Sequence, residues 1–153
     1  MKALTIHQPW ASLLAIGAKR YETRGWATKY RGAIAIHAGK AKVIDLREET
    51  MLAASRCLGI DAGDPLMYRQ AMDSLPRGAV IAVAALVDCH EIYARADGAI
   101  CIAPRGVETV LSGDERAFGL WESGRFAWEL ADVRILPAPC PAMGQQGLWN
   151  WEV

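Results

Sequence analysis

Three charged residues near the N-terminus, Lys19, Glu22 and Arg24, are of types that can recognise a nucleotide, and they lie within six residues of one another. A lysine and an arginine can hold phosphate, and a carboxylate can accept a hydrogen bond from an exocyclic amine or take a proton from water. Trp10 and Trp26 flank them, and aromatic rings between basic side chains are typical of sites where a base stacks. The candidate site is therefore the segment of residues 7–26.

A short helix is expected to deliver the first part of this site. Pro9 suits the first helical position, and Gly17 suits the left-handed residue that follows a helix end. Between them Trp10, Leu13 and Leu14 share one helical face, which should pack on the core.

A strand is expected to follow the helix, because polar and aromatic side chains alternate after Gly17. Lys19 has the wrong parity for the charged face of this strand and can join it only from the turn after Gly17. One face of the strand is predicted to carry Arg20, Glu22, Arg24 and Trp26, and the other face Tyr21 and Thr23.

Composition limits the classes of function. Seventeen basic residues balance seventeen acidic ones over 153 residues, so nucleic-acid binding must come from a local patch and not from the whole surface. The longest apolar run, residues 79–87, is too short to span a bilayer, so we expect a soluble, intracellular protein with no membrane partner. The length predicts a single domain over residues 1–153.

The four cysteines are widely spaced and form no C-x-x-C pair. They are interpreted as reduced packing residues, and the adjacent Cys89 and His90 alone are a weak indication of zinc. We therefore predict no metal and no cofactor.

The rest of the chain predicts an α+β fold: a small, mostly antiparallel β-barrel with a short N-terminal helix and a two-helix insertion. A parallel α/β sheet fits less well, because the second half has almost no helical period. Residues 94–124 should form only short strands and loops, and prolines 137–141 should end the strand before them. Strands are expected at residues 2–6, 33–38, 79–93, 126–136 and 148–153, and further helices at residues 41–58 and 65–75.

The segment from Gln8 through Arg24 resembles the G-x-K-x-x-E-x-R motif of the ASCH family. The Tyr30-Arg31-Gly32 turn, the strand end Ile36-His37-Ala38 and the terminal Gly147-Leu148-Trp149 support the resemblance, which covers nearly the whole chain. It implies a PUA-like β-barrel related to RNA-binding domains, residence in the cytoplasm, and a cleft between the first helix and the barrel. The ligand-binding residues that it implies are Gln8, Trp10, Lys19, Glu22, Arg24, Trp26, Tyr30 and His37.

Three interpretations of these residues remain open. The first is binding of RNA or of a nucleotide, in which the cleft recognises an unpaired base or a modified nucleoside. The second is hydrolysis in the same cleft, as in N4-acylcytidine amidohydrolases or ribonucleases, with Lys19 and Glu22 as the catalytic residues and Arg24 stabilising an oxyanion. The third is a structural ion-pair network, or simply a solvated edge strand. His37, at a strand end, is likewise either a ligand-binding or a structural residue.

Two departures from the family pattern bear on the chemistry. Related amidohydrolases carry a nucleophilic threonine three residues after the motif lysine, where this chain has Glu22, and Thr23 is expected on the opposite strand face. Met143 stands before Gly144, where related sequences often carry a basic residue. The resemblance therefore implies that the threonine mechanism and one phosphate contact are absent here.

Overall fold

Two long antiparallel strands, β4 (Ala79–Glu91) and β8 (Phe126–Pro141), form the centre of the fold. The computed structural model describes residues 1–153, and its six-stranded sheet has the order β2-β8-β4-β3-β1-β9. Only β1 and β3 pair in parallel; every other pairing in this sheet is antiparallel. The remaining strands of the sheet are β1 (Lys2–Ile6), β2 (Tyr21–Arg24), β3 (Gly32–Ala38) and β9 (Leu148–Asn150).

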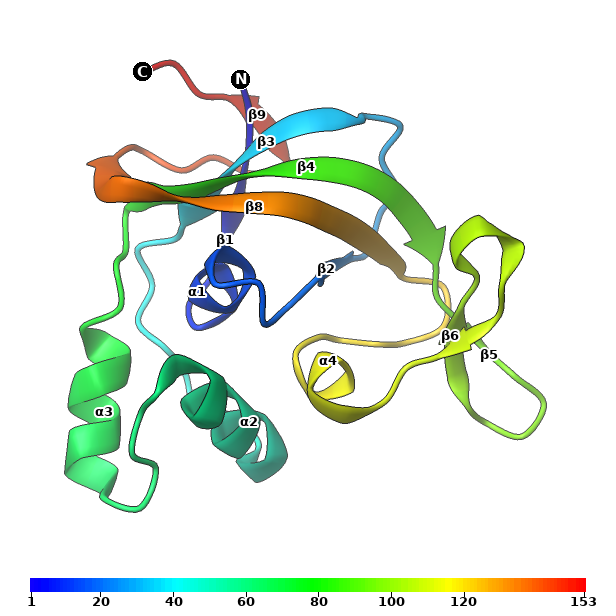
Figure 1. Cartoon of the computed structure of the whole chain (residues 1–153), viewed down its shortest axis with the longest axis horizontal. Helices are drawn as coiled ribbons and strands as arrows, with labels where there is room; N and C mark the ends of the chain where they lie inside the picture. Colours follow the sequence, from blue (N-terminus) through cyan, green and yellow to red (C-terminus); the bar gives the residue numbers. More distant parts are fainter.

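The sheet curls into a half-barrel, and the helices lie beneath it in Figure 1. This confirms the predicted α+β class with a barrel-like, mostly antiparallel sheet. Helix α1 (Trp10–Ala15) lies against β3, β4 and β8 on the inner side, because Leu14 and its neighbours bury one apolar face there. Burial of this kind stabilises the fold by about 25 cal/mol for each Å² of apolar surface. The core around the helix includes Leu4, Ile6, Ile36, Leu86 and Trp128.

Prolines do not end β8 where the sequence predicted. The register of β8 against β4 shifts at this point: Val80 pairs with Cys140, whereas Ala82 pairs with Ile135. The four residues between Ile135 and Cys140, which include two prolines, form a bulge, where a missing N–H costs no ladder hydrogen bond. The predicted end at residue 136 was therefore wrong. The closing strand is also shorter than predicted, ending at Asn150.

The two inserted helices are α2 (Glu48–Leu58) and α3 (Pro65–Asp73). The prediction began the first of them seven residues too early, since residues 41–47 are not helical and Arg47 has a ψ of 148°, outside the helical range. Asp64 accepts hydrogen bonds from the N–H groups of Leu66 and Met67 and so caps α3, as its sequence indicated.

Residues 93–124 contain a small second sheet of β5 (Tyr93–Ala94), β6 (Ile100–Ile102) and β7 (Thr109–Val110). They also contain a 3-10 turn (Pro104–Gly106) and α4 (Gly113–Ala117). The short strands were predicted. Helix α4 was not, because five residues carry too little period to detect. Phe118 and Trp121, just after α4, are buried and attach this segment to the main body.

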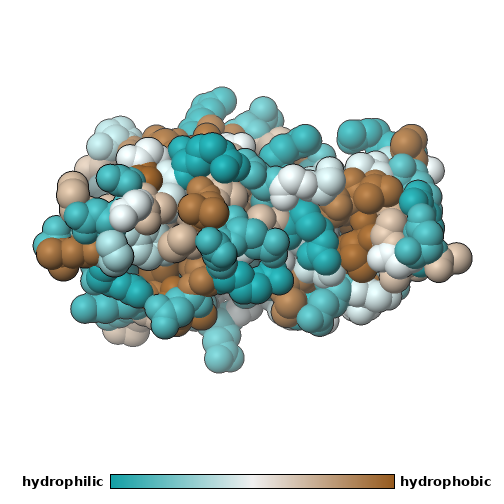
Figure 2. All heavy atoms as spheres, turned by 90° about the horizontal axis from the view of Figure 1, so that it is seen from below, coloured by the Kyte–Doolittle hydropathy of each residue, from teal (hydrophilic) through white to brown (hydrophobic).

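Seen from the helix side, hydrophilic side chains cover most of the middle of the molecule (Figure 2). A larger apolar area appears at the right, where Figure 1 places the small sheet. None of the helices has the length and the apolar character needed to cross a membrane.

Candidate functional site

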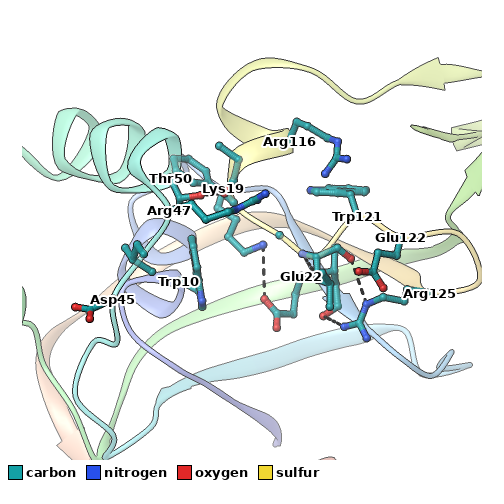
Figure 3. Close-up of a pocket in the computed structure, with 16 residues that line it drawn as sticks. Trp10, Lys19, Glu22, Asp45, Arg47, Thr50, Arg116, Trp121, Glu122 and Arg125 are labelled. Atoms are coloured by element: carbon teal, nitrogen blue, oxygen red, sulfur yellow. Dashed lines mark hydrogen bonds and ion pairs between the residues drawn. The ribbon is translucent and has the colours of Figure 1, made fainter. Parts of the chain in front are cut away.

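A cavity of about 590 Å³ lies along β2, the edge strand of the main sheet. Its walls come from α1, from residues 45–50 at and just before the start of α2, and from residues 116–125, which include the end of α4 (Figure 3). Lys19 and Glu22 lie in the middle of it, with Trp10 on one side and Trp121 on the other. We call this space the first cavity.

Glu22 stands between two cations at the bottom of the first cavity. Its Oε2 lies 3.7 Å from Nζ of Lys19, and its Oε1 lies 3.2 Å from Nε of Arg24. The structure thus brings together the three charged residues of the motif. The Glu22 side chain is 12% exposed, so part of its carboxylate can still contact a ligand in the cavity.

Lys19 is an almost completely buried ammonium group, with 1% of its side chain exposed. Its Nζ donates a hydrogen bond to the carbonyl oxygen of Tyr21. Burial lowers the pKa of Lys19 below its ordinary value, although the charges of Glu22 and Glu115 act in the opposite direction. Lys19 therefore fixes the Glu22 carboxylate and is poorly placed to meet a phosphate group directly.

The turn after Gly17 positions Lys19, as the parity argument required. Gly17 has a φ of +78°, and the N–H of Lys19 donates to the carbonyl of Leu13, 3.1 Å away. In β2, Glu22 lies opposite the buried Trp128 of β8, so its side chain points to the inner side of the sheet.

Arg20 does not share the face of Glu22, contrary to the prediction. It precedes β2, its guanidinium lies 5.8 Å from the centre of the Tyr21 ring, and its Nη2 lies 3.9 Å from Oε1 of Glu129. The alternation could not be extended back to Arg20 because the strand begins one residue later.

A second carboxylate near Lys19 was missed by the sequence reasoning. Glu115, from α4, accepts a hydrogen bond from the N–H of Arg20 at 2.7 Å, and burial raises its pKa. Its Oε2 is buried and has no hydrogen-bond partner. No sequence signal relates it to the motif, because 95 residues separate it from Arg20.

Aromatic side chains form the walls of the first cavity. Trp10 is half-buried, and its ring is tilted by 55° against Phe118 at 6.3 Å. Trp121 is 2% exposed, and its indole N–H donates to the carbonyl of Glu115 at 2.8 Å. Trp10 is therefore the ring with a face free to meet a ligand, and Trp121 is a fixed wall.

Thr23 also lines the first cavity, although it was expected on the other face of the strand. This happens because the cavity follows the free edge of β2. The hydroxyl of Thr23 accepts a hydrogen bond from the N–H of Leu120 at 3.1 Å, and neither Lys19 nor Glu22 is hydrogen-bonded to it. An activated nucleophile needs a base within hydrogen-bond reach, so this geometry does not favour Thr23 in that role.

Three of the residues predicted to bind ligand line a second cavity of about 720 Å³: Arg24, Trp26 and His37. Arg24 spans the inner side of the sheet, and its Nη2 donates to the carbonyl of Thr5 in β1 at 2.8 Å. The predicted single cleft is thus two cavities, and the Glu22–Arg24 ion pair stands between them.

Gln8 and Tyr30 lie at neither cavity. Gln8 is buried; its amide donates to Oγ of Ser12 at 2.8 Å and to the carbonyl of Pro76 at 2.7 Å, and it accepts from the N–H of Ser12. It thus satisfies the start of α1, because Pro9 occupies the capping position and not the first helical position as predicted. The hydroxyl of Tyr30 donates to the carbonyl of Ala33 and fixes the turn before β3.

Asp88, His90 and Glu129 form a cluster whose side-chain atoms could hold a metal ion. His90 and Glu129 are buried, and Nε2 of His90 lies 2.7 Å from Oε2 of Glu129. This hydrogen bond satisfies both groups, and Asp88 is paired with Arg31 at 3.1 Å. Cys89, the neighbour considered as a ligand, is not part of the cluster.

Comparison with known proteins identifies the family. A model of the ASCH domain matches residues 4–134. Human activating signal cointegrator 1 is 38% identical over 87 residues, and the mouse protein of the same name is 37% identical over 87 residues. These matches cover 56% of this chain but only 14% of each relative. From the extent of the domain match, the chain belongs to the ASCH domain family.

Proposed function

We propose that the protein recognises RNA or a nucleotide by holding an unpaired base or a modified nucleoside in the first cavity. The observation that carries this proposal is the Glu22 carboxylate, held by Lys19 and Arg24 at the bottom of a cavity that has the half-buried ring of Trp10 as one wall. The RNA-binding domains to which the ASCH family is related supply a second, weaker support.

The dimensions and the chemistry of the cavity fit a nucleoside. About 590 Å³ lies within the usual range for small-molecule sites. Trp10 provides a surface for stacking, and Glu22 accepts a hydrogen bond from an exocyclic amine such as that of cytosine. Lys19 is buried behind Glu22, so its role at this cavity is to hold the carboxylate and not to contact phosphate.

Calorimetric titration with cytidine, N4-acetylcytidine and uridine tests the proposal. We expect cytidine or its acetylated form to bind and uridine to bind at least about tenfold more weakly, since uracil offers no amine to Glu22. Trp10→Ala should weaken both by removing the stacking surface, about 1–3 kcal/mol for each base. Equal binding of cytidine and uridine would contradict recognition through Glu22.

Hydrolysis in the first cavity is the second candidate, and the lowered pKa of Lys19 beside Glu22 favours it. In that reaction Glu22 would activate a water molecule as general base. Arg24 is not a suitable oxyanion group, since it lines the other cavity and is bound to Thr5 and Glu22. Chromatographic detection of cytidine and acetate released from N4-acetylcytidine would establish this activity, and its absence would leave binding as the function.

A further inference from the structure

We propose that the second cavity binds a phosphate group of the nucleotide whose base occupies the first cavity, or of its neighbour in the strand. This inference rests on the proposed function and adds to it that the ligand is phosphorylated. The second cavity, of about 720 Å³, lies between β1, the end of β2, the end of β3 and residues 143–147.

Charge is the first argument. Arg24 and Lys40 line the second cavity together with the imidazoles of His7 and His37, and no aspartate or glutamate lines it. In a chain with equal numbers of acidic and basic residues, a cavity of one sign is a local feature that selects anions. The first cavity differs, because Glu22, Asp45 and Glu122 line it alongside its basic groups.

The shape of the loop at residues 143–147 is the second argument. A Cβ atom on Gly144 would lie 2.5 Å from Cε1 of His37 and 2.8 Å from Oγ1 of Thr5, so the backbone approaches the cavity wall more closely than another residue would allow. Gly147, with a φ of +67°, returns the chain to β9. Between the glycines, the exposed amides of Gln145 and Gln146 provide neutral donors at the cavity, which suit a phosphate oxygen.

His37 is the third argument. Its Nε2 lies 3.0 Å from the carbonyl of Ala142, to which it donates, and its ring packs edge-on against Trp149. Its Nδ1 is buried and has no hydrogen-bond partner in the protein, an arrangement that costs free energy. In the protein alone, burial and the charge of Lys40 lower the pKa of His37. The negative charge of a bound phosphate group opposes both effects, so His37 can then take a proton from solvent at Nδ1 and donate it in a hydrogen bond to a phosphate oxygen.

The two cavities adjoin at one ion pair. Glu22 lines the first, Arg24 lines the second, and Oε1 of Glu22 lies 3.2 Å from Nε of Arg24. A nucleotide can therefore place its base at the carboxylate and its phosphate at the guanidinium. Trp26, which is 40% exposed beside the second cavity, is available to stack on the next base of a strand.

NMR of the tryptophan side chains tests each cavity separately, because Trp26 lines the second and Trp10 and Trp121 line the first. The probes are inorganic phosphate, cytidine, cytidine 5′-monophosphate and a tetranucleotide RNA. We expect phosphate to shift the indole signal of Trp26 and Nδ1 of His37 only, and cytidine to shift Trp10 and Trp121 only. The monophosphate should shift both sets and bind at least about tenfold more tightly than cytidine.

The phosphate gain should depend on exposed residues of the second cavity. Lys40→Ala and Gln146→Glu should each lower the affinity for the monophosphate about tenfold and leave the affinity for cytidine unchanged. Lys42→Ala removes an exposed lysine that lines neither cavity and is the matched control.

The outcomes separate the two proposals. A monophosphate that binds no more tightly than cytidine, or phosphate that shifts Trp10 and not Trp26, would overturn the phosphate site and leave the base site intact. If phosphate shifts the NMR signal of Trp26 but cytidine shifts no tryptophan signal, the phosphate site is supported and the proposed base site is wrong. Tetranucleotide binding at least about tenfold tighter than that of the monophosphate, with a larger shift of Trp26, assigns the phosphate to a strand, and equal binding assigns it to a free nucleotide.

Discussion

Lys19 is held at the site at a cost to folding. Its ammonium group is buried, and its pKa is lowered by loss of hydration even though two carboxylates lie nearby. Between that lowered value and the ordinary value of 10.5, the unfolded chain binds more protons than the folded protein. The contribution of Lys19 to the free energy of unfolding therefore rises as pH increases through this range and is unfavourable below it.

Replacing Lys19 with methionine should make the protein more stable at neutral pH. The variant avoids burying the charge, and Glu22 keeps Arg24 as its partner. We expect the free energy of unfolding at neutral pH to rise by about 1 kcal/mol, and the alkaline rise in stability to disappear. Urea denaturation from neutral pH up to 10.5 measures both effects. A variant that is less stable at neutral pH would show that the ion pair contributes net stability.

The sequence could predict those charged residues of the site that are brought together by patterns spanning a few residues. The turn at the left-handed residue Gly17 brings Lys19 to Glu22, and strand alternation places Glu22 on the same face as Arg24; both rules act within a few residues. The contribution of Glu115 could not be predicted, since it depends on where α4 packs. The division into two cavities was also out of reach, because it depends on Arg24 crossing the sheet to the carbonyl of Thr5.

At the scale of elements, the site depends on two loop-rich segments: one packs along the edge strand β2, and the other packs over the end of β3. Residues 116–125 cover the free edge of β2, where the hydroxyl of Thr23 accepts a hydrogen bond from the N–H of Leu120. Residues 143–147 line the second cavity beside His37. Both segments belong to the half of the chain with the least regular pattern. Their positions follow from contacts with the folded sheet and not from local sequence preferences.

Gly144→Ala should disturb the second cavity and spare the first. The added methyl group would meet His37 and Thr5 at distances that no Cβ tolerates, so the loop of residues 143–147 must move. We expect the affinity for cytidine 5′-monophosphate to fall to that for cytidine, with cytidine binding unchanged, as measured by calorimetry. Retention of the full affinity for the monophosphate would show that this loop does not hold the phosphate.

The matched control for this variant is Gly63→Ala, in the exposed loop between α2 and α3. Gly63 lines neither cavity, and a Cβ atom there would meet only Oδ1 of Asp61, at 3.1 Å. Because that oxygen ends an exposed side chain, it can shift away. The control should therefore leave the affinities for cytidine and for its monophosphate unchanged.

Local signals also decided which elements of the fold could be predicted. The apolar run of β4 and the N-cap of α3 are signals of this kind, and both were found; the end of α3, predicted at residue 75, lies at Asp73. The extension of β8 through its prolines was missed, because the bulge opposite Val80 and Ala82 is set by the partner strand and not by β8 itself.

At the scale of the whole molecule, charge balance decides how the protein can attract a nucleic acid. The chain has seventeen basic and seventeen acidic residues, so no net charge attracts a phosphate backbone to its surface from a distance. Binding must therefore come from the few basic groups at the two cavities, and each contact with phosphate releases counterions.

RNA binding should accordingly be weak and strongly dependent on salt. With about three phosphate contacts, raising salt from about 50 mM to about 200 mM should lower the affinity for a short single strand about 20-fold. Fluorescence anisotropy of a labelled tetranucleotide measures this dependence. Cytidine, which carries no phosphate, is the control and should bind equally at both concentrations. Tight binding that is insensitive to salt would contradict a local basic site.

The central claim is that Glu22 reads a base, and Glu22→Gln tests it most directly, because glutamine keeps the shape and one acceptor oxygen but removes the charge. Calorimetry and product analysis of both proteins with cytidine and N4-acetylcytidine give the answer. We predict that affinity weakens by about 1–3 kcal/mol and that neither protein turns over substrate. Turnover by the wild type that falls by about two to four orders of magnitude in the variant, with affinity unchanged, would contradict this and make Glu22 a general base. An earlier melting transition with no change in affinity would contradict it as well, and would assign Glu22 to a structural ion-pair network.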